Sequence, residues 1–258
     1  MLRPRITPCL LVHKGGLVKT VGFKSPKYVG DPINAVKIFN EKEADELVVL
    51  DIDASVNHSE PDYRMIANLA AECRMPLCYG GGIKTPEQAK RIISLGVEKV
   101  AISSAAVDHP ELITQIADEI GRQSVVVVLD VKKRLFSKDY DVFTYNARCN
   151  TKRSVFELAG EAEKLGAGEL VINSIDLDGA MTGYNLALAE KVRQSVNIPI
   201  TILGGAGKLG DIEALIRVCG VVGASAGSLF VFKGVYKAVL INYPTLVQRD
   251  ELIRRAFS

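Results

Sequence analysis

The stretch Ser124-Val125-Val126-Val127-Val128-Leu129-Asp130 places an unbroken apolar run directly before a single carboxylate. Four consecutive valines are typical of a strand that is buried on both faces, as in a parallel sheet covered by helices. Asp130 would then lie where the strand emerges from the core. A carboxylate at that point is either a general acid or base at the mouth of a barrel or a cap for the following loop.

Short β-rich runs of this kind recur along the chain, and helical patterns separate them. Eight such runs occur, at residues 6–12, 46–50, 76–79, 100–103, 125–129, 170–173, 198–203 and 220–224. Eight strands alternating with helices in 258 residues fit a (β/α)8 TIM barrel better than an open doubly wound sheet. Because no linker or low-complexity run interrupts the pattern, we expect residues 1–258 to form a single α/β barrel domain.

The two halves of the chain resemble each other. Gly80-Gly81-Gly82 in the first half corresponds to Gly204-Gly205-Ala206 in the second. Self-similarity at half the chain length predicts a barrel built from two half-barrel repeats. The predicted half-barrels cover about residues 1–120 and 121–258. By the same reasoning, Val128-Leu129-Asp130-Val131 aligns with Cys9-Leu10-Leu11-Val12, which pairs Asp130 with Leu11. One half therefore has a carboxylate at this position and the other has an aliphatic side chain.

Composition excludes several classes of protein. The 32 Lys and Arg residues nearly balance the 30 Asp and Glu residues, so no bulk charge is available to hold a nucleic acid or an anionic membrane. Five scattered cysteines without a CxxC pair argue against a disulfide framework and a zinc site. Nothing in the sequence predicts a metal or another cofactor. No apolar run approaches the roughly 20 residues of a membrane span, and the start of the chain has no apolar signal core, so we expect a cytoplasmic protein.

Glycine clusters follow the third and seventh predicted strands, and a small polar pair follows the next strand in each half. Glycines let the backbone approach an anion closely, and amide groups at a short helix start donate to it. The pattern predicts two anion sites on opposite sides of the barrel mouth, although a glycine cluster alone is more often a tight turn. One site comprises Gly82, Ser103 and Ser104, and the other comprises Gly205, Gly227 and Ser228. Two such sites suggest a long substrate with a phosphate or similar anion at each end.

Two further sets of residues are candidates for contact with this substrate. Asp178-Gly179, after the sixth predicted strand, either contacts the substrate or only forms a turn. Lys19 lies in a long first loop at residues 13–30, where it either closes over an anion or stays solvated. A second long segment, at residues 132–150, alternates apolar residues such as Leu135 and Phe136 with polar ones, like a small hairpin. Long loops at the carboxyl ends of strands serve as lids or binding loops, and a tolerated surface insertion is the alternative.

Four charged residues directly precede apolar strands at the opposite, amino-terminal end of the predicted barrel. They are Arg5, Glu46, Lys99 and Glu169. Charges at this end normally serve stability or solubility. Because their signs alternate, they would instead be able to pair with one another and close an axial opening. The pattern alone leaves both interpretations open.

A set of short stretches, spread over essentially the whole chain, matches one known family. The stretches are Arg5-Ile6 with Cys9-Leu10, Gly30-Asp31-Pro32, Asp45-Glu46-Leu47-Val48 with Leu50-Asp51-Ile52, Gly80-Gly81-Gly82-Ile83, Ala105-Ala106-Val107, Leu112-Ile113-Thr114-Gln115-Ile116-Ala117, Val142-Phe143-Thr144-Tyr145, Gly166-Ala167-Gly168-Glu169, Ser174-Ile175-Asp176 with Asp178-Gly179, and Gly204-Gly205-Ala206-Gly207-Lys208. Together they resemble the cyclase subunit of imidazole glycerol phosphate synthase, a lyase and (β/α)8 barrel of histidine biosynthesis.

This resemblance implies a partner and a reaction. In that family a glutaminase subunit docks on the amino-terminal face and releases ammonia, which passes through the barrel to a bis-phosphorylated substrate. The products are imidazole glycerol phosphate and an aminoimidazole carboxamide ribotide. The resemblance implies that Asp130 is the second catalytic aspartate of the family and that Ser103 and Ser104 replace its usual Asn-Thr pair. It also implies that the four charged residues of the amino-terminal end form the family's ammonia gate.

The sequence departs from the family at the centre of the predicted site. The first catalytic aspartate of the family falls at Leu11, which cannot exchange a proton. Asn173 and Leu203 stand where the family has small hydroxyl residues, and Ala180-Met181 replaces a polar pair. His13, two residues beyond Leu11, either replaces the missing acid or lies exposed at the start of a loop.

These departures leave three functional hypotheses. The first is a cyclase subunit whose activity is impaired or altered by Leu11. The second is an ammonia-channelling scaffold without cyclase activity, which couples a glutaminase to a separate synthetase in amidino-sugar formation for surface lipopolysaccharides. The third is the sister isomerase, which uses the same half-barrel plan, but the gate residues favour the cyclase.

Overall fold

The valine run lies in strand β7 (Val125–Lys133), whose residues from Val125 to Leu129 are buried. β7 pairs in parallel with β6 (Lys99–Ile102) on one side and with β10 (Glu169–Ser174) on the other. A continuous apolar run suits such a strand because both of its faces are covered. The computed structural model describes residues 3–134, 137 and 139–258.

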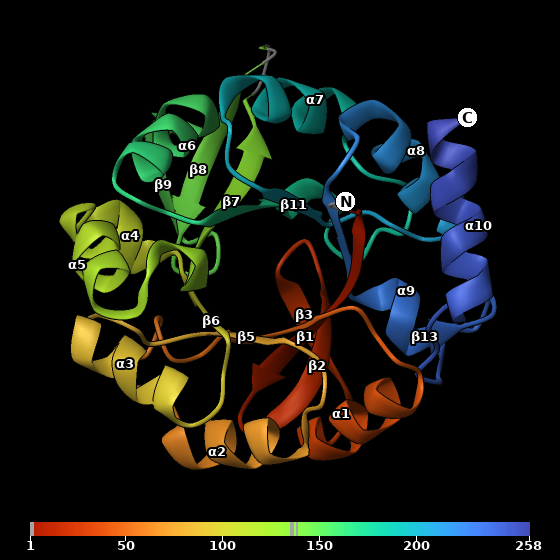
Figure 1. The fold of residues 1–258 in the computed structure, drawn as a ribbon, viewed down its shortest axis with the longest axis horizontal. Helices are drawn as coiled ribbons and strands as arrows, with labels where there is room; N and C mark the ends of the chain where they lie inside the picture. The colour runs from red at the N-terminus through yellow and green to blue at the C-terminus, as the bar shows by residue number, and fades with distance from the viewer. Residues whose placement is uncertain (1–2, 135–136, 138) are drawn as a thin grey trace.

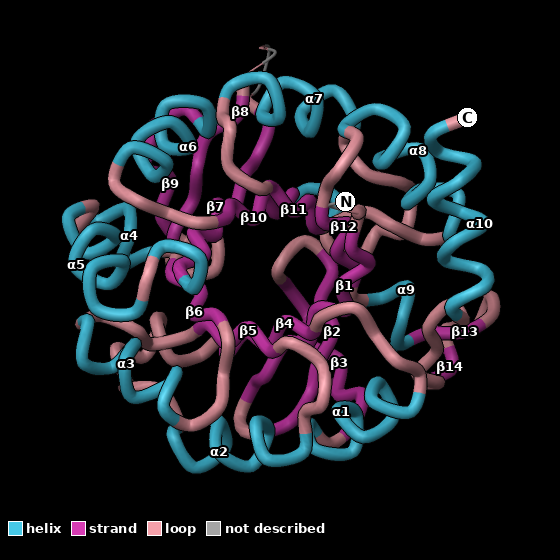
Figure 2. The backbone as a smooth tube through the Cα atoms, viewed as in Figure 1, coloured by secondary structure: helices cyan, strands magenta, loops and turns pink. Residues whose placement is uncertain are grey.

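Eight parallel strands close into a barrel, and helices surround it (Figure 1, Figure 2). In order around the barrel the strands are β1 (Arg5–His13), β4 (Leu47–Asp51), β5 (Leu77–Gly80), β6, β7, β10, β11 (Ile200–Leu203) and β12 (Gly223–Ala226). β12 pairs with β1 and closes the ring. The prediction of a (β/α)8 barrel is therefore confirmed.

The eighth strand begins later than the sequence pattern predicted. The pattern suggested residues 220–224, whereas β12 spans Gly223–Ala226. Gly220 instead follows helix α8 (Leu209–Cys219) as its C-cap, with a positive φ of 69°. Glycine is preferred at this position because it adopts a positive φ without a steric penalty. The apolar pair Val221-Val222 lies in the connection and imitates the start of a strand.

The outer layer consists of helices that follow the barrel strands. The longer ones are α1 (Pro32–Glu41), α2 (Tyr63–Glu72), α3 (Pro86–Ser94), α5 (Glu111–Ile120), α6 (Val155–Lys164), α7 (Leu186–Ser195), α8 and α10 (Leu246–Phe257). The short ones are α4 (Ser104–Asp108) and α9 (Ser228–Val231), with 3-10 turns η1 (Arg122–Ser124) and η2 (Ile175–Leu177). No helix among the described residues is long and apolar enough to cross a membrane.

Side chains of the barrel strands alternate between two apolar clusters. Ile6 and Leu10 of β1 join the large cluster between the strands and the helices. Cys9 joins a smaller cluster inside the barrel, and Leu11 packs against it. Because side chains of a strand alternate with a period of two, residues 5, 7, 9 and 11 of β1 face the barrel interior. The inner cluster consists of Cys9, Val48, Cys78, Ala101, Val126, Val128, Val171 and Leu203.

Both long segments form antiparallel hairpins. Residues 13–30, predicted as a loop, contain β2 (Gly16–Val21) and β3 (Lys24–Gly30), and β2 pairs with β1. The second segment contains β8 (Tyr140–Thr144) and leads into β9 (Cys149–Ser154), and β8 pairs with β7, as the alternating pattern suggested. Leu135 and Phe136, which belonged to that pattern, lie outside the described residues. A smaller hairpin, β13 (Phe232–Lys233) with β14 (Ala238–Val239), follows α9.

Candidate active site

A cavity opens at the carboxyl ends of the barrel strands. Its empty volume, including the part that is open to solvent, is about 1240 Å³. All ten residues predicted to bind or transform a substrate line this cavity. They are Lys19, Gly82, Ser103, Ser104, Asp130, Asp178, Gly179, Gly205, Gly227 and Ser228. Leu11, the position that the internal repeat of the sequence pairs with Asp130, lines the same cavity.

Asp130 lies at the level where β7 leaves the barrel core. The neighbouring strand places Asn173 directly opposite it, and Asn173 Nδ2 donates a hydrogen bond of 2.8 Å to Asp130 Oδ1. Burial raises the pKa of Asp130 to about 7; the hydrogen bond from Asn173 opposes this shift, and the charge of Asp178 adds to it. Near neutral pH this carboxyl group can therefore both release and accept a proton.

Two other carboxylates line the cavity, but each is occupied by contacts within the protein. Asp51 Oδ1 accepts backbone hydrogen bonds from Asp53 (2.9 Å) and Ala54 (3.2 Å). Asp178 Oδ2 accepts hydrogen bonds from the Thr20 hydroxyl (2.6 Å) and from a backbone amide of the same hairpin. No hydrogen bond from a described residue reaches Oδ2 of Asp130. Among the described residues, Asp130 therefore accepts fewer side-chain hydrogen bonds than the other two carboxylates of the cavity.

The turn at Asp178-Gly179 fastens the β2–β3 hairpin to the barrel. The backbone amide of Gly22 donates to Asp178 O at 3.0 Å. A Cβ atom added at Gly179, whose φ is 67°, would lie 2.1 Å from Thr20 O. Glycine is therefore required for this close approach of two backbones. These contacts favour the structural alternative for Asp178, namely that it positions the hairpin beside the cavity.

The first predicted anion site lies between β5 and α4. Gly82 has a φ of 75°, and a Cβ atom there would lie 2.8 Å from the carbonyl oxygen of Ser59. Ser103 directly precedes α4, and Ser104 begins it. The Ser104 hydroxyl oxygen accepts a hydrogen bond of 3.0 Å from the amide of Tyr145. A backbone amide at the start of a helix and a serine hydroxyl are both able to donate to an anion, so the arrangement is compatible with the predicted site.

The second predicted anion site contains a buried ammonium group. Lys19 lies in strand β2, not in a loop as predicted, and its side chain is buried. Its Nζ donates to the carbonyl oxygen of Cys9 at 2.5 Å. A Cβ atom at Gly227 would lie 2.6 Å from this Nζ, so the ammonium group adjoins the start of α9. Burial lowers the pKa of Lys19, and a bound anion would favour its charged form.

The structure does not bring His13 to the cavity. Its Nδ1 lies 2.7 Å from Asp53 Oδ1, and the residue pairs with Gly16 where β1 turns into β2. The lining of the cavity includes Leu11 but not His13. The hypothesis that His13 replaces the missing acid therefore has no support from the geometry.

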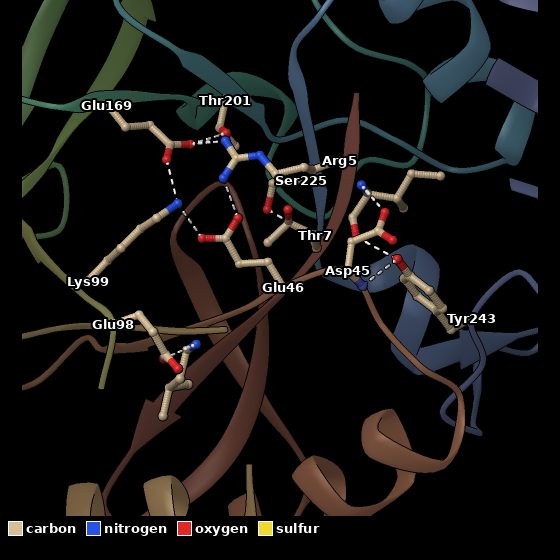
Figure 3. Close-up of polar contacts among 12 residues, drawn as sticks. Arg5, Thr7, Asp45, Glu46, Glu98, Lys99, Glu169, Thr201, Ser225 and Tyr243 are labelled. Atoms are coloured by element: carbon tan, nitrogen blue, oxygen red, sulfur yellow. Dashed lines mark hydrogen bonds and ion pairs between the residues drawn. The ribbon is translucent and has the colours of Figure 1, made fainter. Parts of the chain in front are cut away.

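The four charged residues at the amino-terminal end form a closed ring of ion pairs (Figure 3). Arg5 contacts Glu46 at 2.5 Å and Glu169 at 2.6 Å, and Lys99 contacts the same two carboxylates at 2.7 and 2.9 Å. Burial would raise the pKa of Glu169, but attraction to Arg5 and Lys99 outweighs this effect and lowers it. Each charge in the ring has two partners of opposite sign. We call these four residues the charged ring.

Comparison with known proteins identifies the family. The chain matches the histidine biosynthesis protein family over residues 5–237. The chain belongs to this family. It is 59% identical over 253 residues to a Vibrio vulnificus protein provisionally named as a subunit of imidazole glycerol phosphate synthase, covering 98% of this chain and 97% of that protein. It is 56% identical over 252 residues to a protein of Leptospira interrogans provisionally named subunit HisF, covering 98% and 99% of the two chains. Imidazole glycerol phosphate synthase subunit HisF of Lactococcus lactis is 42% identical over 217 residues, which is 84% of each chain.

Sequence reasoning missed a network that fixes the charged ring in this member of the histidine biosynthesis family. Asp45 Oδ2 accepts from the backbone amide of Ile6 at 2.9 Å, and the Tyr243 hydroxyl donates to Ile6 O at 2.6 Å. The buried Arg249 of α10 donates to Asp45. The network therefore holds the backbone beside Arg5 from both sides, as Figure 3 shows for Asp45 and Tyr243. No local pattern reveals these contacts, because the partners lie far apart in the sequence.

Proposed function

We propose that this chain is the cyclase subunit of an imidazole glycerol phosphate synthase-like glutamine amidotransferase. It would use ammonia from a glutaminase subunit and a bis-phosphorylated ribotide, and form imidazole glycerol phosphate and an aminoimidazole carboxamide ribotide. One observation supports this proposal: the two predicted sets of anion-binding residues and Asp130 line the same cavity. A substrate with a phosphate at each end would then lie across the carboxyl group.

Asp130 is the proton-exchanging group of the proposed reaction. Addition of ammonia and closure of the imidazole ring require proton transfers, and a carboxyl group with a pKa of about 7 can serve as both acid and base at neutral pH. Leu11 offers no second group for this purpose. Because one positioned acid or base typically contributes about 10²–10⁴ in rate, we expect slow cyclisation.

The amino-terminal end suits the delivery of ammonia. The charged ring lies at this end of the barrel, and the apolar inner cluster lies between the ring and the cavity. An apolar interior accepts neutral ammonia far more readily than the ammonium ion. A glutaminase subunit docked at this end would release ammonia at the ring, and displacement of one cation would open a path inward.

A second function is favoured by the apolar centre of the cavity. Leu11, Leu203 and Met181 line the cavity close to the position where the reaction would occur. An ammonia-channelling scaffold would need the charged ring and the inner cluster but no second acid. In that case the chain would couple a glutaminase to a separate synthetase in amidino-sugar formation for a surface polysaccharide.

The decisive experiment compares the wild type with Leu11→Asp in an ammonium-dependent cyclisation assay. If the chain is a slow cyclase, the wild type should turn over the bis-phosphorylated ribotide, and Leu11→Asp should accelerate it. Turnover by Leu11→Asp alone would support the scaffold, because the substrate site would survive without its chemistry. Absence of turnover in both proteins, together with no binding of the ribotide by calorimetry, would refute the cyclase proposal.

A further inference from the structure

The small hairpin of β13 and β14 presents two large side chains to solvent at its turn. Val235 is 96% exposed and Tyr236 is 97% exposed. The amide of Lys237 donates a hydrogen bond of 3.1 Å to the carbonyl oxygen of Gly234, which closes the turn. Figure 2 shows the hairpin at the outer edge of the molecule. Neither side chain contributes to the core, so the turn holds them in contact with water. We call residues 234–237 the hairpin tip.

Exposed lysines surround the hairpin tip. Lys233 and Lys237 flank it in the sequence, and Lys24 and Lys27 lie on the neighbouring strand β3. The Lys27 ammonium group lies 5.3 Å from the centre of the Phe232 ring at the base of the small hairpin, so the two hairpins are adjacent. We call these four residues the lysine group. Together with the hairpin tip they form one surface that is both apolar and basic.

No carboxylate of the two segments offsets this charge. Residues 13–30 and 228–248 contain neither Asp nor Glu. Asp31, which follows the first segment, caps α1 by accepting from the amide of Asn34 at 2.9 Å. Asp250, which follows the second, contacts Arg3 at 3.4 Å. The near balance of charge in the whole chain, which spoke against an anionic membrane as a partner, therefore conceals a local excess of positive charge.

The type of cation indicates which partner this surface suits. Residues 13–30 and 228–248 contain no arginine, so every exposed cation of the surface is a lysine. Interfaces between proteins are enriched in arginine and depleted of lysine. Anionic lipid headgroups, in contrast, attract each nearby lysine and strengthen binding about fivefold per residue. Tyrosine is enriched where a membrane meets water, because its ring is apolar and its hydroxyl is polar.

We propose that the hairpin tip and the lysine group form a docking surface for an anionic lipid membrane, with Val235 and Tyr236 inserted among the headgroups. The inference goes beyond the proposed function and does not depend on it, since none of these residues lines the cavity. Two inserted side chains and four lysines give weak, reversible binding that requires anionic lipid. The hairpin follows α9, whose start borders the second anion site, so docking would bring that side of the cavity near the lipid surface.

The first test is sedimentation of the full chain with lipid vesicles. We expect the wild type to bind vesicles of equal parts phosphatidylglycerol and phosphatidylcholine, and not vesicles of phosphatidylcholine alone. Binding to the mixed vesicles should fall about tenfold or more in Val235→Ser/Tyr236→Ser, since burial of one exposed apolar side chain has an effect of about this size. It should fall about fivefold in Lys237→Gln. Both apolar positions are almost fully exposed, so their substitution leaves the core intact.

Val221→Ser is the matched control for this experiment. Val221 is 44% exposed and lies in the connection before β12, at the amino-terminal end of the barrel. This variant should bind the mixed vesicles as the wild type does. Failure of the wild type to bind the mixed vesicles, or equal binding by Val235→Ser/Tyr236→Ser, would overturn the proposal.

The second test locates the inserted residue. The chain contains no tryptophan, so Tyr236→Trp introduces a single fluorophore. Its emission should shift to shorter wavelength with the mixed vesicles and be quenched by brominated lipid, whereas the emission of Val221→Trp should change in neither way. Unchanged emission of Tyr236→Trp would show that the hairpin tip stays in water and that the proposal is wrong. A dimer in analytical ultracentrifugation that Tyr236→Ser dissociates, without binding of the wild type to vesicles, would identify a protein interface and also overturn it.

Discussion

The two ends of the barrel hold their charges in opposite ways. At the amino-terminal end, each member of the charged ring has two partners of opposite sign, and the pKa of Glu169 is lowered as a result. At the carboxyl end, Asp130 accepts a hydrogen bond from the neutral amide of Asn173, and burial raises its pKa to about 7. Paired charges stabilise their ionised forms and resist titration, whereas a poorly solvated carboxyl group exchanges protons near neutrality. The two ends therefore differ in charge state: the pairs of the charged ring stay ionised near neutral pH, whereas Asp130 can exchange a proton there.

The largest effect is expected at the carboxyl end. Asp130→Asn removes the group that exchanges protons, so ammonium-dependent cyclisation should fall by about 10²–10⁴ or become undetectable. The same substitution should stabilise the fold at pH 8. Because the folded pKa of Asp130 is raised, its carboxyl group destabilises the protein increasingly as the pH rises from the unfolded pKa near 4 through about 7.

Urea unfolding at pH 4 and pH 8 measures this second effect. We expect Asp130→Asn to gain up to about 4 kcal/mol at pH 8, following the linkage between pKa and stability, and little at pH 4. Asp118→Asn, an exposed carboxylate on α5, is the control and should change stability equally little at both pH values. Unchanged cyclisation by Asp130→Asn would show that the proton transfers occur elsewhere.

The next effect tests the charged ring. Lys99→Met leaves Glu46 and Glu169 to share Arg5. Each of these two carboxylates is less than 10% exposed, and each loses one of its two cations. Removing one partner of a buried pair costs about 3–5 kcal/mol, and because Lys99 is itself 19% exposed we expect about 2–3 kcal/mol at pH 7. The lowered pKa of Glu169 stabilises the fold above the unfolded value near 4.3, and this stabilisation disappears as the pH falls. The difference between wild type and Lys99→Met should therefore shrink below pH 4.

The control for this prediction is an ion pair on the surface with a similar distance between its charged atoms. Lys90 contacts Glu119 at 2.5 Å, but the lysine side chain is 68% exposed. Exposed pairs contribute little because water screens them. Lys90→Met should leave the urea midpoint unchanged at every pH, and an equal loss in both variants would mean that the ring has no special stability.

The sequence was sufficient to predict the features that depend on residues close together in the chain. The valine run identified β7, and the position of Asp130 after it identified the carboxyl end of the barrel. The charged residues of the ring could be found because each lies at the start of a strand, and the starts of parallel strands meet at one end.

The features that the sequence did not reveal depend on long-range packing. Lys19 seemed to belong to a loop because glycines surround it, whereas the pairing of β2 with β1 buries its ammonium group beside Gly227. The contact between Asp45 and Arg249 joins two residues that are 204 positions apart in the sequence. Neither contact has a signature at a fixed spacing, since each depends on where the closed barrel places distant segments.

A smaller effect is expected at the second anion site. Lys19→Met removes the ammonium group beside Gly227 and keeps the length of the side chain. A hydrogen bond to a charged group contributes about 1.5–3 kcal/mol, so the Kd of the bis-phosphorylated ribotide should rise about 10–100-fold. Isothermal titration calorimetry measures this change. Lys24→Met, at an exposed position of the same hairpin, is the matched control and should bind as the wild type does. Equal binding by Lys19→Met would place the second phosphate elsewhere.

The smallest effect is expected from the hydrogen bond that Asn173 donates to Asp130, and its removal tests the contrast between the two ends. Asn173→Val removes the donor to Asp130 Oδ1, and because this hydrogen bond lowers the pKa of Asp130, the carboxyl group should titrate at a higher pH in the variant. Carbon-13 NMR of labelled aspartate detects the shift directly, and the acidic limb of the cyclisation profile should move with it. Asn146→Val is the control, since Asn146 also lines the cavity but donates to the carbonyl oxygen of Ile52. A shift of the Asp130 pKa in both variants would point to a general change of the cavity. A shift in Asn173→Val alone would show that one neutral hydrogen bond lowers the pKa of Asp130, as the cations of the charged ring lower that of Glu169.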